Sequence, residues 1–412
     1  MSNLVALVPL VLFLILALAV SLVVRRRTHA AGGGFVKEYF IGNRALGGFV
    51  LAMTTIATYG SVSSFVGGPG QAWLVGWGWV YMAVVQVTAL VLLYGILGKK
   101  MALVSRKLDA VTVIDVIRAR YSSNALANVS AVVVVLFFAA TMVAQFVGGA
   151  KHFEAVTGYS YLVGLVLLGV AVVLFTTIGG FRGVAVTDAI CGVAMLIGII
   201  GYSVSVAGAI PMLGTSAESE TVIVHLANVM SSHGALFAVV AGVILAGILA
   251  ATMSTADSQL LAAASSVSQD IAVEFMGVKL SGRRSLLVAR LTVAGIALVG
   301  LVLAWNPNSS VFRVVSFAWA GFGAAFGPVM LLSLFWRRSN RQGAMAGMIA
   351  GGAMVFLWKF ALAPLGGVFA IYELLPAFIA ALAADVIVSL ATAAPDASIT
   401  RMFDEVTSSG RR

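Results

Sequence analysis

Long runs of apolar residues alternate with short polar segments along almost the whole chain. An apolar run of about 20 residues is the length that an α-helix needs to cross the hydrocarbon core of a bilayer. A scan with a window of that length predicts about eleven membrane-spanning helices. Their expected limits are 3–24, 47–70, 73–98, 124–149, 158–178, 184–210, 235–268, 285–305, 310–336, 342–362 and 370–392. The pattern therefore predicts an all-α, polytopic membrane protein, in which the second and seventh helices are irregular.

The first apolar run has the charge pattern of a retained helix. It is followed directly by Arg25, Arg26 and Arg27. A cleaved signal peptide carries its positive charge before the apolar stretch, and that stretch is shorter. We therefore expect 3–24 to stay in the protein as a membrane-spanning helix.

The lysines and arginines lie in alternate loops between the apolar runs. Of the 25 basic residues, 22 belong to one set of loops and three to the other. In membrane proteins the cytoplasmic loops carry the excess of lysine and arginine. We therefore expect a multi-pass protein of the cell (inner) membrane, with the N-terminus outside and the C-terminus in the cytoplasm.

The composition excludes most classes of soluble protein. Hydrophobic residues make up 61% of the chain and charged residues 10%, whereas a soluble domain is nearer half apolar and a quarter charged. The net charge of +10 resides in the loops, so we expect no nucleic-acid partner. The single cysteine, Cys191, allows no disulfide within the chain. The sequence holds no zinc-protease, nucleophile-elbow or phosphate-loop motif, so we expect neither an enzyme nor a cofactor.

The second predicted helix carries a polar stretch at its centre. Residues 57–64 include a glycine and several hydroxyls, and 67–70 add three glycines and a proline. Unwound backbone at membrane depth is stable only where it lines a cavity or binds something. Two interpretations are open, a cavity or ion path and close helix packing through small residues. The clustered hydroxyls favour the first, with Thr58, Tyr59 and Ser61 as candidate residues.

The seventh predicted helix holds an acid and four hydroxyls deep in an apolar run. The stretch 252–258 includes Ser254, Thr255 and Ser258, together with Asp257. Ser254 and Ser258 are four residues apart and therefore share one helix face. Hydroxyls and freed backbone carbonyls suit a hard cation such as sodium, as in transporters with discontinuous helices. The alternative is that these hydroxyls bond only to carbonyls of their own helix.

Two further acids lie inside predicted spans, where a carboxylate is costly and usually faces inward or pairs. Asp188 opens the sixth span, six residues after Arg182, so the two do not share a helix face. A role on an ion path and a structural role are equally open for Asp188. Asp385, in the last span, is expected to be a packing or snorkelling residue.

Several runs of the sequence resemble those of the sodium:solute symporter family. They are 38–44 (EYFIGNR), 63–70 (SSFVGGPG), 76–79 (GWGW), 95–100 (GILGKK), 179–182 (GGFR), Thr187-Asp188, Met253-Ser254-Thr255 and 318–328 (AWAGFGAAFGP). The runs from 63 to 100 are most similar to the sodium/pantothenate branch, and 318–328 is closer to the proline branch. The resemblance extends over nearly the whole chain from about residue 37.

The resemblance implies a transporter core of two inverted five-helix repeats, with sodium between the first broken helix and the eighth core helix. Carried onto this chain, the implied sodium ligands are the carbonyls of Ala57, Gly60 and Ala251 and the hydroxyls of Ser254 and Thr255. Asp188 matches the family's acid near the ion path, and Asp257 is a further candidate for that path. Tyr59 stands where the proline branch has a sodium-binding aspartate, which favours pantothenate.

The chain departs from the family between the sixth and seventh predicted spans. The family has two more core helices there, whereas 211–234 is expected to be a short loop that leaves the substrate cavity open. We therefore expect one transmembrane domain (1–412) with two core helices missing. Its parts are a peripheral first helix (1–24), a first repeat (47–210), an incomplete second repeat (235–336), two peripheral helices (342–392) and a cytoplasmic tail (393–412).

The sequence predicts a sodium-coupled symporter that imports a small organic solute, with pantothenate favoured. One alternative is a sodium/proline symporter, and another is a non-transporting, truncated remnant or membrane sensor. The short tail after residue 392 counts against a sensor. The expected partners are the solute, Na+ as coupling ion and the lipid bilayer, with no obligate protein partner.

Overall fold

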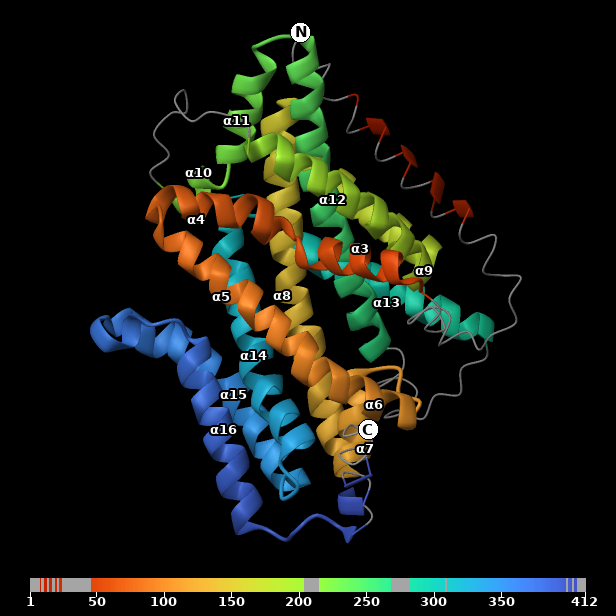
Figure 1. Cartoon of the computed structure of the whole chain (residues 1–412), viewed down its shortest axis with the longest axis vertical. Helices are drawn as coiled ribbons and strands as arrows, with labels where there is room; N and C mark the ends of the chain where they lie inside the picture. Colours follow the sequence, from red (N-terminus) through yellow and green to blue (C-terminus); the bar gives the residue numbers. More distant parts are fainter. Residues whose placement is uncertain are drawn as a thin grey trace. The chain divides into compact units, whose positions relative to one another are not determined.

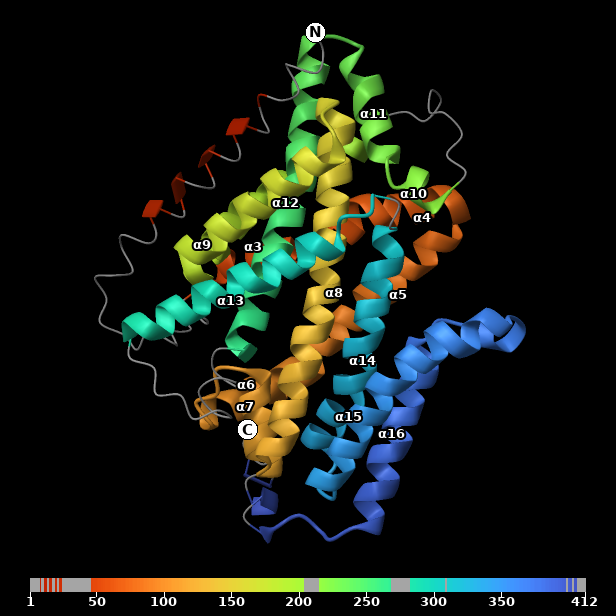
Figure 2. The ribbon, with the colours of Figure 1, turned by 180° about the vertical axis from the view of Figure 1, so that it is seen from behind.

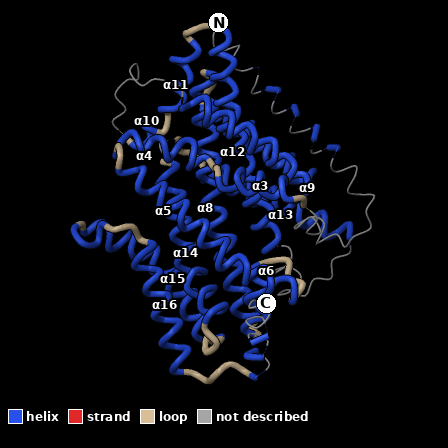
Figure 3. The backbone as a smooth tube through the Cα atoms, viewed as in Figure 1, coloured by secondary structure: helices blue, strands red, loops and turns tan. Residues whose placement is uncertain are grey.

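The computed structural model describes residues 46–203, 215–267, 282–307 and 310–397, with scattered positions in 8–23 and 399–405. Every element among these residues is a helix, and the tube in Figure 3 shows helices joined by loops. The predicted all-α class is therefore confirmed. The predicted first span, 3–24, lies largely outside the described residues.

Eight of the eleven predicted spans correspond to described segments that are long and apolar enough to cross a membrane. Seven are single helical segments, and the eighth is a pair of helices, Gly48–Tyr59 and Ser63–Val75, bent by 56° at the break between them. The irregular second span that its glycines and hydroxyls predict is therefore confirmed. The predicted span 285–305 corresponds to a shorter apolar helix, Leu287–Leu303.

The described helices form two compact units, of which the first comprises Met1–Tyr81, Phe138–Ala264 and Ser281–Val315. Its elements are α3 (Gly48–Tyr59), η2 (Ser63–Gly67), α4 (Gly68–Val75), the C-terminal part of α8 (Asn124–Thr157), α9 (Tyr161–Ser203), α10 (Ser216–Ser219), α11 (Val222–Ser231), α12 (Ala235–Ser265) and α13 (Gly282–Leu303). Both α3 and α13 pack against α9, and α4 packs against α10 and α11 (Figures 1 and 2). The most deeply buried of the membrane-spanning helices is α12.

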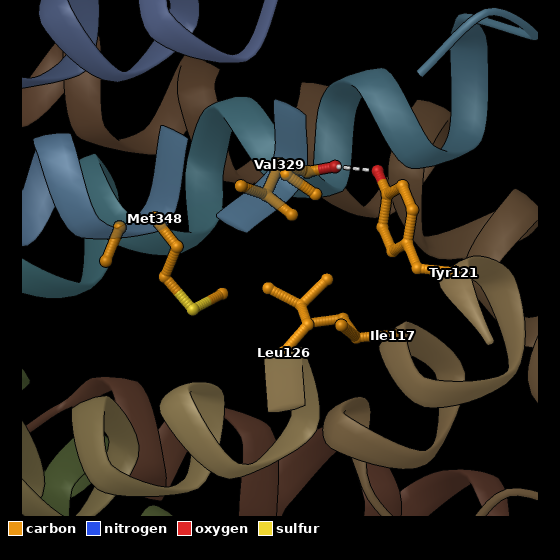
Figure 4. Packing of buried hydrophobic residues seen from close by; sticks show 7 residues of the cluster. Ile117, Tyr121, Leu126, Val329 and Met348 are labelled. Carbon is orange, nitrogen blue, oxygen red and sulfur yellow. Dashed lines mark hydrogen bonds between the residues drawn. The ribbon is translucent and has the colours of Figure 1, made fainter. Parts of the chain in front are cut away.

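The second unit comprises Met82–Phe137, Ser265–Leu280 and Ser316–Arg412. Its elements are most of α5 (Gly78–Leu92), η3 (Leu93–Gly98), α6 (Lys99–Lys107), α7 (Val113–Tyr121), the N-terminal part of α8, most of α14 (Val311–Phe335), α15 (Arg341–Leu357), η5 (Trp358–Leu362), η6 (Ala363–Leu365), η7 (Gly367–Ala370) and α16 (Leu374–Ala391). One of its cores joins Ile117, Tyr121 and Leu126 to Val329 and Met348 (Figure 4). Within it the Tyr121 hydroxyl donates to the Val329 carbonyl at 3.4 Å.

Small residues let α15 and α16 lie close together, side by side in Figures 1 and 2. A Cβ added to Gly347 would lie 2.8 Å from the Cβ of Asp385, and one added to Gly343 would lie 1.9 Å from the Ser389 hydroxyl. Asp385 is fully buried, and the Ser389 hydroxyl donates to its Oδ1 at 3.1 Å. Of the two roles expected for Asp385, the structure therefore supports packing.

Two predictions about the spans are wrong. The predicted spans 158–178 and 184–210 fall largely within one helix, α9, which continues through Gly179 and Gly180. A glycine inside a helix costs only about 1 kcal/mol relative to alanine, so two glycines do not force a break. The seventh span is not irregular either, because α12 is an unbroken α-helix from Ala235 to Ser265. Its hydroxyls and its acid are therefore side-chain features of a regular helix.

The described part of the segment 211–234 is helical and packed, so the prediction that this segment is a short loop is wrong there. It holds α10 and α11, and α11 buries its apolar residues Val222, Ile223, Val224, Leu226 and Ala227. The ten residues of α11 are too few to cross a bilayer. The segment therefore does not span the membrane. Its helices α10 and α11 form a short cover that packs against α4.

Candidate functional site

The break between α3 and η2 redirects three backbone amide groups. Ser61 N–H donates to the Tyr59 carbonyl at 2.9 Å, and Ser64 N–H donates to the Ser61 carbonyl at 2.9 Å. Val62 N–H donates to a side chain, the Oε1 of Gln145 on α8, at 3.3 Å. All three bonds depart from the α-helical pattern, in which each amide bonds to the carbonyl four residues before it.

These changes release three carbonyls at the end of α3. In a regular helix the amides of residues 61, 62 and 64 would bond to the carbonyls of Ala57, Thr58 and Gly60. The Thr255 hydroxyl of α12 lies 3.5 Å from the Ala57 carbonyl oxygen and 3.1 Å from that of Thr58. Carbonyls released by an unwound helix are the groups that coordinate cations in transporters. The break therefore presents backbone oxygens where α3 meets α12.

A buried carboxylate from α9 faces the same place. Asp188 is fully buried, and the Thr54 hydroxyl of α3 donates to its Oδ2 at 2.7 Å. The Ser254 hydroxyl of α12 also faces this carboxylate. Neither Asp188 Oδ1 nor Ser254 Oγ has a hydrogen-bond partner within the described part of the chain. Because buried polar atoms are nearly always paired, these two oxygens either approach each other or take a further partner.

A second buried acid lies on α12 itself. Asp257 is 2% exposed and accepts a hydrogen bond from the Thr176 hydroxyl of α9. The hydroxyls of Thr58 and Ser258 are 3.3 Å apart, which adds a link between α3 and α12. The helices α3, α9 and α12 therefore meet through hydroxyl groups and two carboxylates.

The remaining predicted site residues lie at the edge of this cluster or away from it. Ala251 is fully buried one turn before Thr255, but its carbonyl belongs to an unbroken helix and is not released by a break. The Ser61 hydroxyl lies 2.6 Å from that of Ser63, within the break. Tyr59 is 47% exposed, so its side chain is not part of the buried cluster.

Sequence reasoning missed three polar residues of the cluster, Thr54, Gln145 and Thr176. Thr54 lies four residues before Thr58 and shares its helix face, a signal that the sequence contains. Gln145 stands alone among the apolar residues of 142–147, which is a weaker signal. The sequence gives no indication for Thr176. The helix around it is apolar on all sides, so no polar face shows which way its side chain points.

The donor groups of the cluster suit a small, hard cation. Among the described residues, no group of three or more histidine, cysteine, aspartate or glutamate side chains could hold a metal ion. The cluster offers backbone carbonyls, hydroxyls and the carboxylate of Asp188 instead. Hard cations bind oxygen ligands, and sodium in particular binds unwound carbonyls in discontinuous helices. The cluster therefore offers the kind of oxygen ligands that a small, hard cation binds.

Known proteins resemble this chain in sequence. A model of the sodium:solute symporter family matches residues 39–211 and 199–351. The sodium/pantothenate symporter of Escherichia coli (strain K12) is 30% identical over 431 residues, covering 84% of this chain and 89% of that protein. The osmoregulated proline transporter OpuE of Bacillus subtilis (strain 168) is 30% identical over 456 residues, covering 89% of this chain and 92% of that protein.

A solved structure resembles this chain in fold. It is a Na+-coupled sialic acid symporter in a substrate-bound, outward-open state, with a TM-score of 0.70 and 16% sequence identity. The match covers 95% of this chain and 99% of that chain. The two proteins therefore share a fold.

The sequence matches also show a difference in length. The aligned lengths of 431 and 456 residues exceed the 412 residues of this chain, so both relatives carry residues that it lacks. The two family matches overlap at 199–211. This is the region after which the resemblance predicts that two helices are missing.

Proposed function

The chain belongs to the sodium:solute symporter family, and on this premise we propose that it is a sodium-coupled symporter importing a small organic solute. Its relatives are secondary transporters and not enzymes, and Na+ is the coupling ion of the family. We place it in the inner membrane, with the N-terminus outside and the C-terminus in the cytoplasm, because of its basic residues. We also propose a core of two inverted five-helix repeats, the second of them incomplete.

The observation that carries this proposal is the break in the second span. Sodium would bind among the released carbonyls of Ala57 and Gly60 and the hydroxyls of Ser254 and Thr255. Of these groups, the Thr255 hydroxyl lies 3.5 Å from the Ala57 carbonyl oxygen. The redirected amides support the two carbonyls as ligands, and the unpartnered Ser254 hydroxyl supports the α12 side. Ala251 rests on the resemblance to the family alone. The ion path would include Thr58, Tyr59, Ser61, Asp188 and Asp257.

Sodium entry can drive solute import from such a site. At a membrane potential of about −100 mV, each entering charge supplies roughly 2.3 kcal/mol. Coupling also requires that sodium and solute strengthen each other's binding by the same factor. Sodium should therefore lower the Kd for the solute as much as the solute lowers the Kd for sodium.

Pantothenate is the solute that we propose, with proline as the alternative. The sodium/pantothenate symporters of Escherichia coli and Haemophilus influenzae are 30% and 31% identical to this chain. Tyr59, where the proline branch has an aspartate, supports the same choice. Uptake of labelled pantothenate and proline by proteoliposomes, with and without a sodium gradient, tests it. If neither solute accumulates, this chain does not transport either of them.

Replacing Ser254 and Thr255 together with alanine is expected to abolish sodium binding. In the wild type, sodium should raise the midpoint of thermal unfolding in detergent, because a ligand at 100 times its Kd stabilises by about 2.7 kcal/mol. The double variant should show no such rise. Thr252→Val is the matched control on α12, since the Thr252 hydroxyl donates to the Ile248 carbonyl of its own helix. An equal sodium response in all three proteins would contradict the site.

A non-transporting remnant of the family is the second candidate, supported by the residues that the relatives carry and this chain lacks. The two candidate functions differ in whether solute transport is retained together with sodium binding. A remnant that keeps the ion site would gain stability from sodium but accumulate no solute in proteoliposomes. A symporter would do both, so the two assays together separate the candidates.

A further inference from the structure

Gln145 of α8 lies beside the break in the second span and contacts it directly. We propose that Gln145 is a positioning residue of the cation site. By accepting the Val62 amide hydrogen, it keeps the Thr58 carbonyl turned toward α12. This inference rests on the proposed sodium site and extends it to a residue on a third helix that is not itself a ligand.

The contact between Gln145 and Val62 is closed to solvent. Val62 is 0% and Gln145 1% exposed, and the amide nitrogen lies 3.3 Å from the side-chain Oε1. A buried amide needs an acceptor, because leaving it unpaired is costly. Two acceptors compete for this one hydrogen. One is Gln145, and the other is the Thr58 carbonyl, four residues earlier in the helical pattern.

The next turn of α8 receives the side chain of the same residue. Gly148 lies three residues after Gln145 and therefore on the same helix face. A Cβ at position 148 would lie 2.2 Å from the Cγ2 of Val62 and 3.1 Å from the Cγ2 of Val311. Thus α8 offers an acceptor for the Val62 amide and a gap for its side chain. Together these two features fix where the break occurs.

The competition for the Val62 amide hydrogen decides which way the Thr58 carbonyl points. While Gln145 holds the Val62 amide, the Thr58 carbonyl lies 3.1 Å from the Thr255 hydroxyl of α12. Without the Gln145 acceptor, the amide returns to Thr58, the helix closes, and the carbonyls at the end of α3 turn away from α12. Sodium affinity should then fall, although every proposed ligand is still present.

Gln145→Met tests the proposal, because methionine has a similar length and carries no strong acceptor. The sodium concentration that gives half of the maximal thermal stabilisation should rise about tenfold, the scale set by one buried hydrogen bond. Gln145→Glu keeps an acceptor oxygen and should restore a midpoint near that of the wild type. Thr141→Val, one turn earlier on α8, is the matched control, since the Thr141 hydroxyl donates to the Phe138 carbonyl. Its sodium midpoint should equal that of the wild type.

A second readout does not depend on sodium. Hydrogen exchange of peptides covering 57–66, measured in sodium-free buffer, should be slower in Gln145→Met, because the amides return to helical acceptors. Unchanged or faster exchange overturns the positioning role, whatever sodium does. An unchanged sodium midpoint in Gln145→Met also overturns it, provided that the wild type responds to sodium. Absence of any sodium response in the wild type overturns the proposed function instead, and the exchange measurement then decides the role of Gln145.

Discussion

Replacing Glu220 with alanine is expected to lower the free energy of unfolding by about 3 kcal/mol or more, because removing one partner of a buried ion pair is strongly destabilising. The Glu220 side chain is fully buried, and its Oε2 lies 3.1 Å from the Nζ of Lys151 on α8. Its Oε1 accepts hydrogen bonds from the Ser310 hydroxyl at 2.9 Å and from the Phe312 amide at 3.1 Å. All three donors lose this acceptor in the variant.

Glu220 also holds the cover, α10 and α11, in place against α4. The backbone at Ser219 and Glu220 lies so close to α4 that a Cβ at Gly70 would be 3.0 Å from it. The Phe312 amide belongs to the first turn of α14, where a negative charge is favourable. One carboxylate therefore joins the cover to α8 and to the start of α14.

Thermal unfolding in detergent measures this effect. Glu220→Gln keeps an acceptor for Ser310 and Phe312 but removes the charge that pairs with Lys151, so its loss of stability should be intermediate. Glu218→Ala, in the short helix that Glu220 caps, removes one half of a capping box and should cost about 1 kcal/mol. If Glu220→Ala is no less stable than Glu218→Ala, the buried ion pair does not hold the cover in place.

Gly351→Ala in α15 is expected to destabilise the second unit by about 1–3 kcal/mol, because it overpacks a close helix contact. The new Cβ would lie 2.3 Å from the Ala324 carbonyl oxygen of α14 and 3.0 Å from the Ala381 Cβ of α16. The nearer atom belongs to a helix backbone and cannot rotate away. Two neighbouring helices must therefore move to admit one methyl group.

Gly352→Ala is the matched control, one residue further along the same helix. A Cβ at position 352 meets no atom within 4 Å among those described. This variant should unfold at the same temperature as the wild type or higher, since alanine favours a helix over glycine by up to about 1 kcal/mol. Equal effects of the two substitutions on the unfolding midpoint would show that α15 is not packed as described.

The sequence predicted the features of this protein that local composition determines. Length and apolarity identified eight of the described spans, and the glycines and hydroxyls of 57–70 identified the one that breaks. The hydroxyl run of α12 lies against other helices of the first unit, because the Thr255 hydroxyl is 3.1 Å from the Thr58 carbonyl oxygen of α3 and Ser254 lies beside the Asp188 carboxylate. Polar residues that interrupt an apolar helix were therefore the ones that the sequence could single out, and their role as sodium ligands stays a prediction.

The rest of the site depends on contacts between helices. A helix that is apolar on all sides has no periodic pattern to show which residue faces which neighbour. For this reason Gln145 and Thr176 were missed, although each makes a buried hydrogen bond to the site. The spans 158–178 and 184–210 were predicted as two separate helices, although glycine weakens a helix without ending it and the chain stays helical through 179–183. Asp188 and Asp385 look alike in sequence, and only packing assigns one to the cluster and the other to a helix contact.

The attachment of α10 by Glu220 also decides where the protein can be engineered. Insertions are tolerated at exposed loop tips whose backbone makes few contacts. The segment 215–231 is not such a place, although its sequence predicted a loop. An epitope tag or a fluorescent label belongs instead in the turn between α8 and α9, where Tyr159 is 64% exposed.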